Sequence, residues 1–233
     1  MEKESPARLR HEYKYSVSAA QEVLLRFKAA SLLLPDPNVR PNGSYLISSL
    51  YFDDLNDSAL NDSIRGADPR SKFRIRMYNG NTQLLRLEKK TKTRGLCRKE
   101  SCELSREECE KLMRGELPPF GPYCTEKKKA LMTELILRGL VPKVIVSFER
   151  YAFVYSGGNV RVTLDRELCS AADVGEFLSG KYTLRPVLPP GQCLLEVKWD
   201  ELLPRHIREA LSLESLSWTA FSKYRMGRRY HLQ

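Results

Sequence analysis

The chain has 233 residues, of which 39 are lysine or arginine and 29 are acidic, so its formal net charge at pH 7 is +10 and its isoelectric point lies near 9.3. Hydrophobic residues make up 42% of the chain, which is enough for a core, and no run of about 18 apolar residues is present that could span a membrane. The positive excess predicts an acidic partner: nucleic acid, an anionic membrane or a phosphorylated small molecule.

The beginning of the chain and its cysteines bear on the cellular compartment. The segment MEKESPARLRHEYKY contains no apolar core and cannot be a signal peptide. The six cysteines show no CxxC spacing and have no partnering histidines, which argues against a zinc site. We therefore expect a reduced protein in the cytoplasm, with no membrane segment of its own.

The first predicted elements are a strand and a helix. Residues 8–15 place Arg10, Glu12 and Lys14 on one strand face. A helix then begins at Ser18, because Ser18 and Gln21 have the spacing of a capping box. Apolar residues recur in it at helical spacing, and we expect this stripe to face the core. The stripe consists of Val23, Leu24, Phe27, Ala30 and Leu34.

Residues 72–99 are the most highly charged part of the chain. Two predicted strands are joined by Asn79-Gly80-Asn81, which suit the positive φ of a tight hairpin. Basic and apolar side chains alternate in both strands, so each has one charged and one apolar face. Residues 65–99 hold twelve lysines and arginines against two acids. Their net charge therefore equals that of the whole chain, +10. A solvated face usually mixes both signs of charge, so this one indicates an anion-binding surface.

The rest of the chain adds further amphipathic strands and helices. Ser105 and Glu108 form a second capping box. A further strand is predicted at residues 96–104. Its register leaves open whether Arg98 or Lys99 lies on the charged face. The other predicted strands cover residues 45–53, 143–155, 159–168 and 194–199; the other predicted helices cover residues 56–64, 125–138, 202–211 and 220–229.

At least seven amphipathic strands favour a closed sheet, because closure removes exposed strand edges. We therefore predict an α+β fold: an antiparallel β-barrel tunnel of about eight strands with flanking helices, formed by one domain over residues 1–233. If the charged faces point outward, the strands enclose an ordinary apolar core. If they point inward, helices must cover the outside, and the strands then enclose a basic tunnel with a few carboxylates.

Eight short motifs resemble, in order, the VTC domain, which is the polyphosphate polymerase domain of the vacuolar transporter chaperone family. That family is a branch of the triphosphate tunnel metalloenzymes, which are also called CYTH-like. The motifs are HEYKY (11–15), SSLYFD (48–53), KFRIRMY (72–78), LEKKTK (87–92), FERYAF (148–153), VRVTLD (160–165), LLEVK (194–198) and SKY (222–224).

The resemblance implies a tunnel that binds a nucleoside triphosphate by its phosphates and transfers the γ-phosphoryl group of ATP to phosphate or to a growing polyphosphate chain. It implies a divalent metal, Mn²⁺ or Mg²⁺, held by Glu196, with Glu12 and Glu88 as further inward acids. Lys198, Arg74 and Arg76 are the expected catalytic residues. The expected substrate-binding residues are Lys14, Arg74, Arg76, Lys90, Lys99, Arg150, Arg161, Lys198 and Lys223.

Several of these residues also have plainer interpretations. Glu196 could serve only as an ion-pair partner of Lys198. Lys198 and Arg150 lie among apolar neighbours, where long basic side chains often reach out to solvent. We interpret Asp165 as a turn former at the end of its strand, and Tyr51 as a packing residue.

Three other functions compete with polymerisation. A tripolyphosphatase or nucleoside triphosphatase of the same fold would pass the phosphoryl group to water, and a non-catalytic tunnel would only sense polyphosphate. Nucleic-acid binding is disfavoured, because few exposed aromatic residues are interleaved with the charges for base stacking. The doubled ExExK pattern of the hydrolase branch is absent from HEYKY, where Tyr13-Lys14 follow Glu12.

The chain departs from the eukaryotic assemblies of the family, which add an N-terminal SPX domain and C-terminal membrane helices. Neither occurs in this sequence, so we expect a stand-alone bacterial form. Its product would stay in the cytoplasm or pass to a separate membrane partner.

Overall fold

The structure is a computed structural model that describes residues 10–231. It contains one antiparallel sheet whose eight main strands follow the order β1-β10-β8-β7-β3-β4-β5-β6. These strands are β1 (His11–Ser18), β3 (Ser44–Asp53), β4 (Arg70–Tyr78), β5 (Asn81–Thr93), β6 (Leu96–Leu104), β7 (Val141–Tyr155), β8 (Val160–Ala171) and β10 (Gln192–Trp199). Two short strands, β2 (Leu34–Pro35) and β9 (Arg185–Pro186), pair with β7 and β8. The predicted first strand also included residues 8 and 9, which lie outside the described part.

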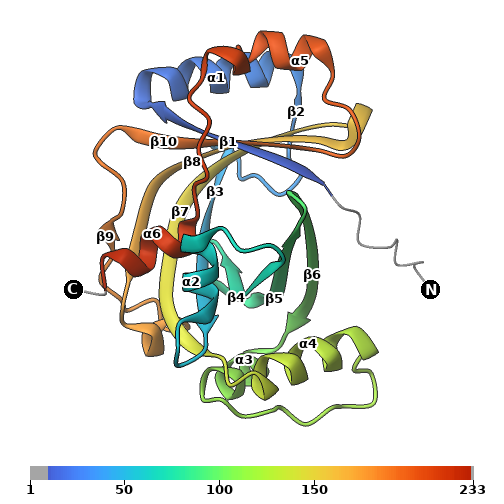
Figure 1. Ribbon diagram of the computed structural model, residues 1–233, viewed down its shortest axis with the longest axis vertical. Helices are drawn as coiled ribbons and strands as arrows, with labels where there is room; N and C mark the ends of the chain where they lie inside the picture. Colours follow the sequence, from blue (N-terminus) through green and yellow to red (C-terminus); the bar gives the residue numbers. More distant parts are fainter. Residues whose placement is uncertain (1–9, 232–233) are drawn as a thin grey trace.

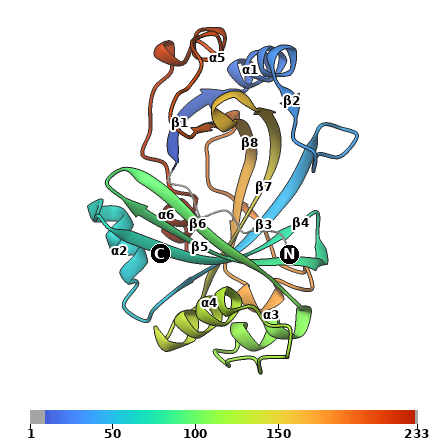
Figure 2. The same ribbon diagram turned by 90° about the vertical axis from the view of Figure 1, so that its right-hand side faces the viewer.

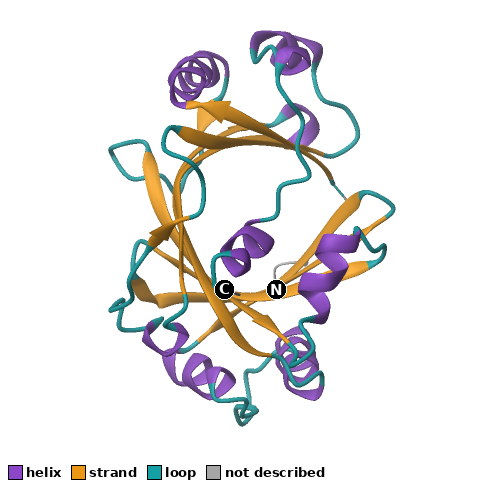
Figure 3. Ribbon diagram, turned by 60° about the vertical axis from the view of Figure 1, so that its left-hand side comes forward, coloured by secondary structure: helices purple, strands orange, loops and turns teal. Residues whose placement is uncertain are grey.

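The sheet is strongly curled (Figure 3), and its two edge strands approach each other at one end. Arg10, just before β1, forms two backbone hydrogen bonds with Cys97 of β6, both 3.1 Å long. The tunnel predicted from the amphipathic strands is therefore confirmed, together with its antiparallel pairing and its flanking helices.

Helices cover the outer face of the sheet at both ends (Figures 1 and 2). The helices of the described residues are α1 (Ala19–Leu32), α2 (Ser58–Arg65), α3 (Arg106–Met113), α4 (Glu126–Leu137), α5 (Arg205–Ala210) and α6 (Lys223–Arg229), with 3-10 turns at η1 (Gly157–Asn159), η2 (Val174–Glu176) and η3 (Leu213–Ser215). Of these, α1, α5, α3 and α4 cover the outer face. One core cluster joins α1 and α5 to β1, β10, β8 and β7. A second joins α3 and α4 to β3, β4 and β5. Because these apolar faces pack outward against helices, the charged faces are left to point inward.

Helix α1 corrects one expectation. Both predicted capping boxes are present, at Ser18 and at Ser105. The predicted apolar stripe of α1, however, faces away from the sheet: Phe27 is 75% exposed, and Val23 and Leu24 are also exposed. The helix instead packs through Leu25 and Ala29, which form a second apolar row at a spacing of four residues.

Helix α6 lies against the inner face of the sheet, beside α2 (Figure 1). A side chain at Gly227 would place its Cβ 2.8 Å from Cγ2 of Val146, so glycine allows α6 to approach β7 closely. Tyr224 then donates a hydrogen bond of 2.6 Å to Asp53 at the end of β3. A third core cluster, of β3, β7, α2 and α6 residues, therefore occupies part of the inner side of the curl.

The remaining predicted elements appear with modest shifts at their ends. The hairpin turn has positive φ at Asn79 and Gly80, as its sequence predicts. The last two helices are shorter than predicted, beginning at Arg205 and Lys223. Across the described residues, no helix combines the length and apolar character needed to cross a membrane.

Candidate functional site

Strand alternation brings the charged side chains together on the inner face of the sheet. Thirteen of them, which we call the tunnel cluster, come from seven strands and from α6. Nine are cations: Lys14, Lys72, Arg74, Arg76, Lys90, Lys99, Arg150, Lys198 and Lys223. Four are carboxylates: Glu12, Glu88, Asp165 and Glu196. The sequence left the direction of the charged faces open, and the structure places them inside.

The first group lies where β1 meets β10. Lys90 donates to both oxygens of Glu12, with distances of 2.8 and 2.7 Å. Lys14 lies 3.0 Å from Oε1 of Glu12 and 3.7 Å from Oε2 of Glu196. Lys198 forms an ion pair with Glu196 and lies 3.7 Å from Oε2 of Glu12. Two carboxylates on adjacent strands thus share the same two lysines, Lys14 and Lys198.

The second group surrounds Glu88 on β5, whose side chain is fully buried. Arg74 on the neighbouring strand β4 contacts Oε2 of Glu88 through Nε at 2.8 Å and through NH2 at 2.7 Å. Lys99 lies 3.1 Å and Arg76 3.7 Å from Oε1. Three cations therefore converge on a single carboxylate. The open register question is resolved in favour of Lys99, since Arg98 instead pairs with Glu100.

The third group is centred on Asp165, and here the interpretation as a turn former is wrong. Asp165 lies inside β8, and its side chain is fully buried. Arg150, directly opposite on β7, donates to Oδ1 at 2.6 Å and to Oδ2 at 2.7 Å. Lys223 of α6 lies 2.6 Å from Oδ2. Arg161 faces the same side of β8, but its guanidinium is held by Asp36 and by the hydroxyl of Tyr45.

Burial and neighbouring charges act in opposite directions on these groups. Burial alone would raise the pKa of Glu196, but the charges of Lys198 and Lys14 outweigh it and hold the pKa well below its ordinary value. The pKa of Glu88 is lowered in the same way, with burial opposed by Arg76 and Arg74. Burial lowers the pKa of Lys198 to about 8 even though Glu196 favours its charged form. The neighbouring cations thus hold the carboxylates ionised, while burial makes the charged form of Lys198 less favourable.

Besides Asp165, three residues of the site were not assigned by sequence reasoning. Tyr51 accepts a hydrogen bond of 3.0 Å from Arg74, which lies opposite it in the sheet. Ser222 precedes Lys223, and its hydroxyl accepts a hydrogen bond of 2.9 Å from Lys72. Lys72 had a visible signal, because it alternates with Arg74 and Arg76. Tyr51 and Ser222 lie in two of the matched motifs, SSLYFD and SKY, but the sequence does not reveal their contacts with Arg74 and Lys72, which come from other segments.

The tunnel cluster is suited to hold a polyanion. Nine cations against four carboxylates leave a formal excess of five positive charges. Arginine forks and lysine ammonium groups are the side chains that bind phosphate oxygens best. Arg76 adds a specific signal, since its buried Nε has no hydrogen-bond partner among the described residues. A buried donor without a partner is costly, so a ligand oxygen at this position would stabilise the site.

The donors also fit a divalent metal that arrives with phosphate. In residues 10–231, no group of three or more His, Cys, Asp or Glu side chains is placed to hold a metal ion. Mg²⁺ and similar ions commonly take only one or two carboxylates and complete their shell with phosphate oxygens and water. Glu12 and Glu196 provide such a pair, on adjacent strands and with shared lysine partners.

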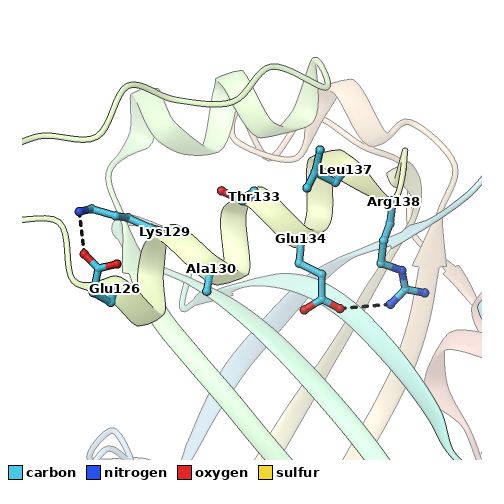
Figure 4. Close-up of a pocket in the computed structure, with 7 residues that line it drawn as sticks. All are labelled: Glu126, Lys129, Ala130, Thr133, Glu134, Leu137 and Arg138. Carbon is cyan, nitrogen blue, oxygen red and sulfur yellow. Dashed lines mark hydrogen bonds and ion pairs between the residues drawn. The ribbon is translucent and has the colours of Figure 1, made fainter.

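An open pocket on the outer surface does not compete with this site. It lies along α4 and is lined by residues of that helix and its end (Figure 4). Its charged side chains are already paired with each other, Glu126 with Lys129 and Glu134 with Arg138. Nothing in it faces the tunnel cluster.

Comparison with known proteins gives one family match. A family model described as the VTC domain matches residues 9–231. No curated protein sequence matches the chain.

Solved structures share the fold at low sequence identity. A putative adenylate cyclase from Bacillus halodurans has a TM-score of 0.56 at 16% identity, covering 94% of this chain and 96% of that one. A putative adenylyl cyclase from Hippeastrum, described as having a dominant triphosphatase activity, has a TM-score of 0.54 at 13% identity over 95% of both chains. A putative adenylate cyclase from Vibrio parahaemolyticus has a TM-score of 0.53 at 11% identity, over 95% and 98%. These similarities show the triphosphate tunnel fold.

Proposed function

Because this chain belongs to the VTC domain family, we propose that it is a polyphosphate polymerase. It transfers the γ-phosphoryl group of ATP to inorganic phosphate or to the end of a growing polyphosphate chain, inside the tunnel. The observation that carries this proposal is the tunnel cluster, in which cations from six strands and from α6 outnumber carboxylates on one inner face.

The chemistry of phosphoryl transfer asks for little more than such a cluster. The transferred group needs alignment and neutralisation of its charge, rather than covalent help from the protein. Arg74 and Arg76 offer planar donors for phosphate oxygens, and Lys14, Lys90 and Lys198 offer point charges. The acceptor is a phosphate oxygen that is already anionic, so it needs no strong base to remove a proton.

The carboxylates hold the cations of the site in position before a ligand binds. In the described structure Glu88 holds Arg74 at 2.7 Å, which fixes the guanidinium before a ligand arrives. Preorganised charges cost no reorganisation at the moment of reaction. Glu196 and Glu12 would hold a Mn²⁺ or Mg²⁺ ion. When bound, that ion neutralises phosphate charge and orients the oxygens it contacts.

A second function is favoured by one comparison. The Hippeastrum protein of similar fold is described as having a dominant triphosphatase activity. In this chain the same cation cluster would bind ATP or tripolyphosphate, and water would replace the phosphate acceptor. The two reactions would use the same binding residues. They differ in whether a phosphate oxygen or a water molecule attacks the γ-phosphorus.

Incubation of the purified protein with ATP and Mn²⁺ distinguishes these functions. Long anionic product on a polyphosphate-stained gel, with a matching amount of ADP, supports the polymerase. Free phosphate without polymer shows the triphosphatase, and no product with ATP still bound shows a sensor. Lys198→Met should abolish the reaction. Lys181→Met, which removes the same charge at an exposed position, should leave it unchanged.

A further inference from the structure

Lys72 occupies an unusual position in the tunnel cluster. It lies on the inner face of β4, directly opposite Lys90 of β5, which in turn lies opposite Lys99 of β6. Three lysines thus stand side by side across three strands. Lys90 is paired with Glu12, and Lys99 is paired with Glu88.

Lys72 differs from these neighbours in its partners. Its Nζ donates to two neutral hydroxyls, Ser63 of α2 at 2.8 Å and Ser222 before α6 at 2.9 Å. The ring of Tyr224 lies 5.5 Å away. Within residues 10–231, no carboxylate lies within ion-pair distance of this ammonium group.

The charged groups that act most strongly on Lys72 all have the same sign. Lys14 approaches from β1, Arg70 from β4, Lys90 from β5 and Arg225 from α6. Burial and then these four charges lower the pKa of Lys72 to about 7. Near neutral pH, therefore, about half of the molecules carry a neutral amine at this position.

The hydrogen bonds suggest what changes when a ligand arrives. A neutral amine has two N–H donors, which satisfy the two serine hydroxyls. An ammonium group has a third N–H donor, and no third acceptor contacts Nζ in the described structure. A phosphate oxygen in the tunnel would supply both that acceptor and a compensating negative charge.

We propose that Lys72 takes up a proton from solvent when a phosphate chain enters the tunnel, so that polyanion binding is coupled to protonation. This inference rests on the proposed function, because it assumes that the tunnel binds phosphate chains. It deepens that function by making the strength of binding depend on pH near neutrality. No bond to carbon or phosphorus changes; one proton moves from water or buffer to Nζ.

Calorimetric titration with tripolyphosphate, in buffers of different ionisation enthalpy, measures the number of protons taken up. Lys72→Arg is the decisive variant, because it keeps the positive charge but does not titrate in this range. Wild type should take up more protons per ligand than this variant, by roughly 0.5 at about pH 7 and roughly 0.9 at about pH 8. Protons that the ligand or Lys198 gains or releases cancel in the difference.

Two further variants complete the test. Lys72→Met should lose the same uptake and also bind more weakly, by at least about tenfold, since it removes a charged donor. Lys181→Arg, at an exposed position, should match wild type. If Lys72→Met does not fold, the comparison with Lys72→Arg still decides.

The outcomes separate this inference from the proposed function. Equal proton uptake by wild type and Lys72→Arg, with tight binding by both, overturns the role of Lys72 and leaves the tunnel function standing. Failure of the wild-type protein to bind tripolyphosphate overturns both.

Discussion

Arg150 and Asp165 face each other across β7 and β8 and form a two-pronged ion pair that is almost completely buried, with distances of 2.6 and 2.7 Å. Lys223 of α6 completes the group at 2.6 Å from the same carboxylate. One aspartate thus fixes two cations, and it joins α6 to the sheet at the tunnel cluster.

Asp165→Asn should destabilise the fold. It leaves Arg150 and Lys223 buried without a compensating charge, and breaking a buried ion pair in this way costs about 3–5 kcal/mol. Denaturant unfolding measures the change. Asp173→Asn, at an exposed position, should cost less than about 0.5 kcal/mol. Equal stability of wild type and Asp165→Asn would contradict the structural role given to this aspartate.

Arg74→Ala should weaken triphosphate binding and also destabilise the protein, because Glu88 is fully buried and loses its nearest cation. The double variant Arg74→Ala with Glu88→Gln should recover part of the lost stability but none of the binding. A double-mutant cycle on unfolding and on tripolyphosphate affinity measures both effects. Recovery of binding in the double variant would show that Arg74 serves only to neutralise Glu88.

Glu196→Gln should spare nucleotide binding and reduce turnover, most strongly when Mn²⁺ is limiting. Loss of a metal carboxylate should raise the Mn²⁺ concentration needed for half-maximal turnover by at least about tenfold. Activity measured over a series of Mn²⁺ concentrations tests this. Glu214→Gln, at an exposed position, is the control. Unchanged turnover at the lowest Mn²⁺ concentration would remove Glu196 from the metal site.

Acid should destabilise the protein through its buried carboxylates. Burial opposes ionisation of Asp165, but Arg150 and Lys223 outweigh it and lower its pKa. A carboxylate whose pKa is lower in the folded state stabilises the fold above its unfolded pKa, about 4, and this contribution is lost as the pH falls through the folded value. The free energy of unfolding should therefore fall below about pH 4. The slope should be shallower for Asp165→Asn, and parallel slopes would count against this cause.

Much of the fold could be predicted because its signals are local. The alternation of charge in residues 72–78 gave β4, and Ser18 and Ser105 gave two helix starts. The orientation of α1 was missed because the helix carries two apolar rows, and periodicity does not tell which one meets the sheet. Leu25 and Ala29 pack against the sheet, although Phe27 belongs to the more hydrophobic row.

Less of the site could be predicted from the sequence, because its contacts join distant segments. Asp165 reads as a turn residue until Arg150 and Lys223 are placed beside it. Lys72 was visible as a basic residue on a charged face. Its lack of a carboxylate partner became visible only when α2 and α6 were placed around it.

The pairing of β1 with β10 sets an order for assembly. His11 lies opposite Trp199, so this pairing joins segments that are far apart in the sequence. Contacts between such distant segments form slowly, because a long loop must close before they are made. We therefore expect Lys14 and Glu196 to meet after the local hairpin of β4 and β5 has formed. A ligand that recognises only the completed tunnel should slow unfolding and leave the folding rate unchanged, so polyphosphate would extend the lifetime of this protein without helping it to fold.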